Sequence, residues 1–147
     1  MAEVRNVAKY FIHLSEESTP YAITPLKLQK LLYYAQGFHL RDTGYPLFND
    51  NLLAWAHGPV VRDIYDDYRH LGYFTIKSEP FYITNHELTN EEIETIENVW
   101  EEYGHLDGKL LEELTHQEDP WLFTHRNEVI DIDLIREYFA NQLILNN

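Results

Sequence analysis

A chain of 147 residues with 44% hydrophobic and 14% aromatic residues is long enough to bury a core and too apolar to be a disordered acidic tail. Its formal charge of −14, from 25 acidic and 11 basic residues, disfavours nucleic-acid binding, and its lack of cysteine excludes disulfides, thiolate zinc sites and cysteine nucleophiles. The N-terminus lacks the pattern of a secretory signal, and no apolar run approaches the roughly 18 residues of a membrane span, so we expect a soluble, cytoplasmic protein.

Two helices are predicted in the first third of the chain. Apolar residues recur at helical spacing near the N-terminus, which predicts an amphipathic helix over about residues 1–16. Thr24 is a good N-cap and Pro25 suits the first helical position, so a second helix begins there. The apolar stripe of this second helix indicates a central place in the core, and Gly37 within the stripe indicates close approach of another element.

The middle of the chain predicts an extended segment, a third helix and a hairpin. Residues 52–56 form a short apolar run that favours a buried strand. Gly58 and Pro59 fit the cap and first position of a third helix, which Gly72 would end. Residues 73–83 are rich in β-branched and aromatic side chains, and this composition predicts a small β-hairpin.

The last third of the chain is predicted to be helical. Thr89 and Glu92 have the spacing of a capping box, so a fourth helix with a dense acidic surface starts there. Leucines predict a short fifth helix around residues 110–114, and a broad apolar face predicts a last helix over residues 131–145. We therefore expect a mainly α (α+β) fold: one compact helical domain over residues 1–147, built around a central helix, with a short extended segment and a small β-hairpin.

Residues that could perform catalysis or bind a metal are sparse. No serine lies in a glycine-flanked turn between a strand and a helix, and no two of the eight histidines are three or four residues apart. The six glycines form no phosphate-binding cluster. The sequence therefore predicts no catalytic residue, no metal and no cofactor.

A cationic stripe on the second helix is a candidate binding surface. Lys27, Lys30, Tyr34 and Arg41 fall close together on a helical projection, opposite much of the apolar face. Tyrosine and arginine often anchor protein interfaces. The alternative is a solvated face that forms salt bridges with the acidic helices. The net negative charge would likewise either speed encounter with a basic partner or simply keep the domain soluble.

Two runs of residues resemble a known family. They are residues 24–36 (TPLKLQKLLYYAQ) and residues 54–61 (AWAHGPVV), the second followed by Tyr65. In order and spacing they resemble the Panacea domain family, also called the SocA-like antitoxin or phage GepA-like family. Residues 113–116 (ELTH) and 119–121 (DPW) are similar to that family too, so the resemblance covers most of the chain.

The resemblance implies an antitoxin of a toxin–antitoxin system, often carried on prophages, that neutralises a cognate toxin by direct binding. It implies a toxin encoded by an adjacent gene, and it supplies no catalytic residue. The family positions that we expect to define the fold are Leu28, Leu31, Leu32, Trp55, Gly58, Pro59, Tyr65 and Trp121. The residues that we expect to contact the partner are Lys27, Lys30, Tyr34, Arg41, His57 and Arg62.

A different class of function stays open at this point. Tyr33, Trp55, His57 and Tyr65 could line a pocket for a small ligand or an enzymatic reaction, because aromatic and titratable residues converge in such sites. The sequence does not decide between this alternative and a protein-binding surface. It also leaves the identity of the toxin and any self-association open.

Overall fold

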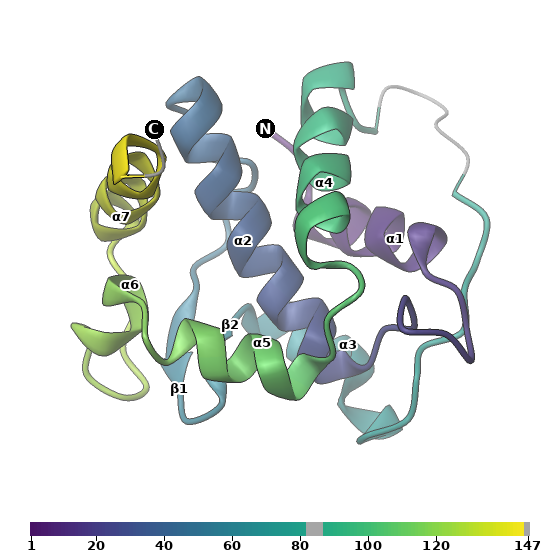
Figure 1. Cartoon of the computed structure of the whole chain (residues 1–147). Helices are drawn as coiled ribbons and strands as arrows, with labels where there is room; N and C mark the ends of the chain where they lie inside the picture. The colour runs from purple at the N-terminus through teal and green to yellow at the C-terminus, as the bar shows by residue number, and fades with distance from the viewer. Residues whose placement is uncertain (82–86, 146–147) are drawn as a thin grey trace.

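A long central helix, α2 (Pro25–Thr43), runs through the middle of the fold, and the other elements surround it (Figure 1). The computed structural model describes residues 1–81 and 87–145. The mainly α fold with a small sheet is confirmed. The remaining elements are α1 (Val4–Leu14), β1 (Leu53–Trp55), β2 (Gly58–Val60), α3 (Arg62–Tyr68), the 3₁₀ helix η1 (Arg69–Leu71), α4 (Asn90–Tyr103), α5 (Gly108–Thr115), α6 (Asp119–Leu122) and α7 (Ile132–Leu145).

Local capping sets both ends of α2, and its start lies where the sequence predicts. The Thr24 hydroxyl accepts a hydrogen bond from the Lys27 N–H at 3.2 Å, and Pro25 occupies the first turn. Gly44, with a φ of 82°, ends the helix in the left-handed conformation. Every residue over 27–40 is buried, because α1 and α4 pack on one side, α6 and α7 lie on the other, and α5 crosses the N-terminal end (Figure 1).

The expected close approach at Gly37 is confirmed. A methyl group placed on Gly37 would lie 2.2 Å from the Phe139 ring of α7, so only glycine leaves room for that ring. Phe139 also packs edge-on against Tyr33, Tyr34 and Phe38. Gly37 therefore sets the distance between α2 and α7 at the centre of the core.

The third helix begins later than predicted, and the small hairpin lies where its start was expected. Gly58 and Pro59 belong to β2, which pairs antiparallel with β1, and α3 begins at Arg62. The Gly58 φ of 106° places it in the left-handed region at the turn of this hairpin. The chain stays extended as far as Val61, whose backbone is hydrogen-bonded to the Gln29 side chain of α2.

The hairpin predicted over residues 73–83 is wrong within the described residues. Residues 73–81 contain no strand, and Ile83 lies outside the described part of the chain. The Ile76 N–H donates to the Ile23 carbonyl at 2.7 Å, and the Ile76 side chain is buried. This segment is an extended connection tied to the loop before α2, which explains why Ile76 is apolar.

The predicted C-terminal helices are confirmed. Thr89 and Glu92 form the expected capping box of α4: the Thr89 hydroxyl accepts from the Glu92 N–H at 3.1 Å, and the Glu92 carboxylate accepts from the Thr89 N–H at 2.8 Å. The Asp107 carboxylate caps α5 by accepting from the Leu110 N–H at 2.8 Å. Helix α7 buries Ile135 and Phe139 against the core.

Candidate protein-binding surface

Polar side chains of α2 bind the backbone of the segments that surround this helix. The Gln29 amide donates to the Val61 carbonyl at 3.1 Å and accepts from the Val61 N–H at 2.8 Å. The Gln36 amide accepts from the Leu47 N–H at 2.7 Å and donates to the Phe48 carbonyl at 2.8 Å. Both glutamines are buried, so they satisfy backbone groups that have no access to water. Helix α2 thus positions β2 and the segment before β1 by hydrogen bonding as well as packing.

Replacing Gln29 with methionine is expected to lower the free energy of unfolding by about 2 kcal/mol, because the buried Val61 N–H loses its partner. The Val61 carbonyl keeps a hydrogen-bond partner, since it also accepts from the Tyr65 N–H. Urea denaturation measures the change. The matched control is Gln117→Met, which removes an exposed bond to the Glu113 carbonyl and should change stability by less than about 0.5 kcal/mol. Equal losses at the two positions would contradict this role of Gln29.

Lys27 and Lys30 lie inside the fold. The Lys27 ammonium donates to the carbonyls of Pro20 at 3.0 Å and Gly104 at 2.6 Å, and the Lys30 ammonium donates to the Pro59 carbonyl at 2.9 Å. Burial lowers the pKa of Lys27 to about 8 and that of Lys30 to about 7. The expected exposed cationic stripe is therefore wrong, because α5 and the β1–β2 hairpin cover the face on which both lysines lie.

Tyr34 and Arg41 do not form a surface with the lysines. Tyr34 is fully buried, and its hydroxyl donates to the Glu118 carboxylate at 2.8 Å, beside a second bond from Tyr33 at 2.9 Å. Burial raises the pKa of Glu118 to about 7 despite these two hydrogen bonds. Arg41 lies at the other end of α2 and forms an ion pair with Asp42 at 2.8 Å.

An exposed cluster of aromatic and arginine side chains lies where β1 meets α3. The rings of Trp55 and Tyr65 pack edge-to-face with centroids 4.8 Å apart. The Arg62 guanidinium lies 5.7 Å from the Trp55 ring centroid, and that of Arg69 lies 5.5 Å from the Tyr65 centroid. Both arginines and Tyr65 are exposed, whereas Trp55 is half-buried. Cation–π contacts of this kind fix the position of an arginine without removing its hydrogen-bonding edge from solvent.

Trp121 of α6 extends this cluster. Its indole N–H donates to the Trp55 carbonyl at 2.8 Å, and the Arg126 guanidinium lies 3.6 Å from its ring centroid. The His116 ring stacks on Trp121 with centroids 4.1 Å apart. We call the cluster the arginine–aromatic surface; it consists of Trp55, Arg62, Tyr65, Arg69, Trp121 and Arg126.

The arginines of this surface differ from the others in their charge partners. Within residues 1–81 and 87–145, none of the three forms an ion pair with a carboxylate. The other three arginines of the chain each have one, in the pairs Arg5–Asp67, Arg41–Asp42 and Arg136–Asp133. A protein with 25 acidic residues therefore keeps unpaired guanidinium groups together on one surface.

His57, at the turn of the hairpin, lies beside this surface. Its side chain is 76% exposed, and its Nδ1 hydrogen-bonds the Glu112 carboxylate at 2.8 Å. Burial alone would raise the pKa of Glu112, but hydrogen bonds from Lys109 and His57 hold this pKa below its usual value. The ionised Glu112 thus links the hairpin turn to α5.

The structure brings together only part of the predicted contact set. His57 and Arg62 are exposed next to Trp55, Tyr65 and Trp121, which the sequence assigned to the fold. Arg69 and Arg126 were not among the residues predicted from the sequence. The spacing of Arg62, Tyr65 and Arg69 at three and four residues is a signal for one helix face that could have found Arg69. Nothing local points to Arg126, which comes close to the others only through the packing of α6 against β1.

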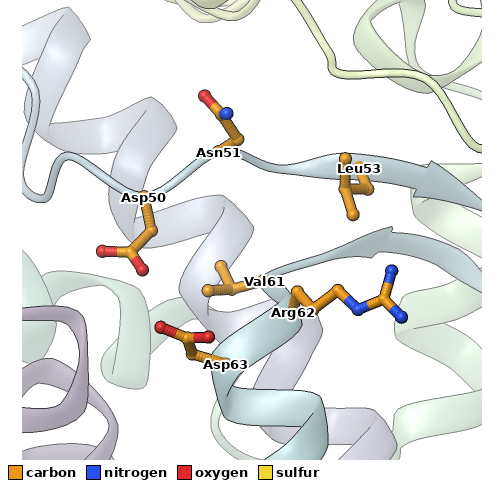
Figure 2. Close-up of a pocket in the computed structure, with 6 residues that line it drawn as sticks. All are labelled: Asp50, Asn51, Leu53, Val61, Arg62 and Asp63. Atoms are coloured by element: carbon orange, nitrogen blue, oxygen red, sulfur yellow. The ribbon is translucent and has the colours of Figure 1, made fainter.

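Tyr33, Trp55, His57 and Tyr65 do not converge on a pocket, because Tyr33 lies in the core while His57 and Tyr65 are exposed. A hollow of about 220 Å³ lies nearby, between the segment before β1 and the start of α3 (Figure 2), and is lined by Asp50, Asn51, Leu53, Val61, Arg62 and Asp63. In Figure 2 the two aspartates face each other, whereas the arginine points away. None of the four expected residues lines this hollow.

Over the described residues, no three histidine or acidic side chains are grouped closely enough to hold a metal ion. In the same part of the chain, no helix has the length and apolar character needed to cross a lipid bilayer. The described side chains define a mainly α protein that exposes the arginine–aromatic surface.

Residues 28–122 match the family described as Antitoxin SocA-like, Panacea domain. This match covers more than half of the chain, and the chain belongs to that family. A curated relative, Antitoxin SocA of Caulobacter vibrioides (strain NA1000 / CB15N), is 51% identical over 43 residues, which are 29% of this chain and 23% of that protein. The similar segment thus spans less than a quarter of the relative's length. No solved structure matches the chain.

Proposed function

We propose that this protein is an antitoxin that neutralises a cognate toxin by direct protein–protein contact, with the toxin encoded by an adjacent gene. Membership of the SocA-like antitoxin family supports the antitoxin role. The arginine–aromatic surface is the observation that supports direct binding, because tryptophan, tyrosine and arginine are the residues that most often carry the binding energy of an interface. Neutralisation then consists of covering the toxin and needs no bond-forming step by this chain.

The shape of the fold suits this proposal. Buried polar bonds from α2 hold the hairpin at Pro59 and the chain just after it at Val61, and α6 is joined to the hairpin through Trp121, so the surface is organised before any partner arrives. A preorganised surface loses less side-chain and loop entropy on binding. We also propose that residues 1–147 act as one domain, since the buried apolar residues of the described part form a common cluster.

Co-expression with the adjacent-gene toxin is the test of this function. Wild-type protein should restore growth and co-purify with the toxin. Tyr65→Ala removes an exposed ring at the centre of the surface and should weaken the complex about tenfold or more. Calorimetry on the purified proteins measures this change.

Tyr45→Ala is the matched control, because Tyr45 is 73% exposed outside this surface and its removal should leave the affinity unchanged. Failure of the wild-type protein both to restore growth and to form a complex would refute direct neutralisation. A complex weakened equally by both substitutions would place the contact elsewhere.

A further inference from the structure

We infer that the arginine–aromatic surface takes up an acidic segment of its partner protein, whose carboxylates pair with Arg62, Arg69 and Arg126 while neighbouring apolar side chains pack on the exposed rings. The inference deepens the proposed function and rests on it for the biological partner. It concerns the local chemistry of the partner's contact segment.

The distribution of charge indicates that the partner supplies anions. Acidic residues outnumber basic ones by 25 to 11, and three of the six arginines of this chain have a carboxylate partner. Arg62, Arg69 and Arg126 nevertheless have none among the described residues, and all three lie along one contiguous chain of contacts through Trp55, Tyr65 and Trp121. The complementary anions are therefore to be supplied from outside.

The contacts of the three arginines hold their guanidinium groups in position for a ligand. Ring contacts at 3.6 to 5.7 Å restrain the three guanidinium groups. Arg126 is also anchored by hydrogen bonds from its Nη2 to the carbonyls of Trp121 and Thr124. The planar guanidinium edges of Arg62 and Arg69 match a carboxylate, which each can bind through two parallel hydrogen bonds, whereas Arg126 keeps its Nε and Nη1 donors for single hydrogen bonds.

Exposed apolar side chains follow Arg69 and Trp121 closely in the sequence and support the inference further. Tyr73 and Phe74, which follow η1, are 97% and 79% exposed, and Leu122 and Phe123, which follow Trp121, are 47% and 72% exposed. Large exposed apolar groups beside cations are typical of an interface with an apolar core and a charged rim. The partner segment should therefore carry apolar residues together with its carboxylates.

A protein segment fits this surface better than a nucleic acid. Bases could stack on exposed aromatic rings, but a polyphosphate strand would extend its charge past the three arginines into the field of a protein with a net charge of −14. A short acidic segment brings only a few carboxylates, which the three guanidinium groups can balance.

The test is selection of a random 12-residue peptide library on the purified full chain. Selected peptides should be enriched in Asp and Glu next to apolar residues. The strongest peptide, made synthetically, should lose at least tenfold in affinity for the variant R62E/R69E/R126E, measured by fluorescence anisotropy.

The matched control is R5E/R41E/R136E, which changes the formal charge equally at arginines with carboxylate partners and should bind within threefold of wild type. Circular dichroism checks that both variants are folded, and R62K/R69K/R126K, which keeps the charge, should bind more tightly than the glutamate variant.

Several results would overturn the inference. One is selection without enrichment of acidic residues, and another is equal loss of binding in the two glutamate variants. Tight binding of a fluorescent 15-nucleotide oligothymidine that depends on the same arginines would assign the surface to nucleic acid. A wild-type dimer that only R62E/R69E/R126E dissociates would assign it to a second copy of this chain.

The two proposals fail separately. If growth is not restored but acidic peptides still bind through these arginines, the toxin partner is wrong and the chemistry of the surface stands. If growth is restored while no acidic preference is found, the chemistry is wrong and the antitoxin function stands.

Discussion

Gly37→Ala is expected to lower the free energy of unfolding by about 3 kcal/mol, although the helix propensity of alanine is more favourable than that of glycine by about 1 kcal/mol. The added methyl would lie 2.2 Å from the Phe139 ring, far inside van der Waals contact. The ring cannot turn aside, because Tyr33, Tyr34 and Phe38 pack against it. Helix α7 must therefore move away from α2, and chemical denaturation followed by circular dichroism measures the cost.

A double-mutant cycle separates this clash from other effects. Phe139→Ala alone removes a buried ring and should cost about 3 to 5 kcal/mol. In that background Gly37→Ala should become neutral or stabilising, because the obstacle is gone and the helix propensity of alanine remains. Equal cost of Gly37→Ala in both backgrounds would show that the contact with Phe139 does not constrain position 37.

The second large effect is a dependence of stability on pH that Glu118 controls. Burial raises the pKa of Glu118 in the folded protein to about 7, above its ordinary value of 4.5 in the unfolded chain. The folded state therefore holds this proton more tightly, and stability falls as the pH rises from about 4.5 to about 7. From this difference, the loss at pH 8 is on the order of 3 kcal/mol.

Glu118→Gln should remove this dependence, because the amide stays neutral and can still hydrogen-bond the hydroxyls of Tyr33 and Tyr34. The variant should exceed the wild-type stability at pH 8, and the difference should shrink toward pH 4.5. Urea denaturation across this range measures both proteins. Lys30 has the opposite effect on stability. Burial lowers its pKa to about 7, so the folded protein becomes more stable as the pH rises above that value. Both wild type and Glu118→Gln contain Lys30, so its contribution cancels in the difference between them.

Tyr34→Phe is a control that should extend the pH dependence instead of removing it. It removes one hydroxyl that stabilises the ionised Glu118, so the pH-dependent loss should extend to higher pH than in wild type. Parallel pH profiles for wild type and Glu118→Gln would contradict the assignment of this dependence to Glu118.

Helix starts were predictable because the interactions that set them are local. Thr24 bonds a backbone N–H three residues away, and Thr89 and Glu92 bond each other's backbone within one turn. The same reasoning failed at Gly58 and Pro59, which suit either a helix start or a hairpin. The extended form prevails there because Gln29, distant in sequence, binds the backbone of Val61.

The candidate surface was only partly predictable. The spacing of Arg62, Tyr65 and Arg69 places them on one helix face, and His57, which the sequence predicts to contact the partner, is exposed. Lys27 and Lys30 were misplaced, because a helical projection shows which residues share a face and gives no account of what packs on that face.

The sequence by itself determined the family, the mainly helical class and the start of the central helix, since these depend on short motifs and on the spacing of apolar residues; it indicated a close approach at Gly37, and the tertiary structure showed that the Phe139 ring makes it. Only the tertiary structure decided that the lysines of α2 are buried against backbone carbonyls and that Arg126 joins Arg62 and Arg69 on one surface. These outcomes depend on contacts between α2, the hairpin and α6, segments far apart along the chain, and charge periodicity within one helix carries no information about such contacts.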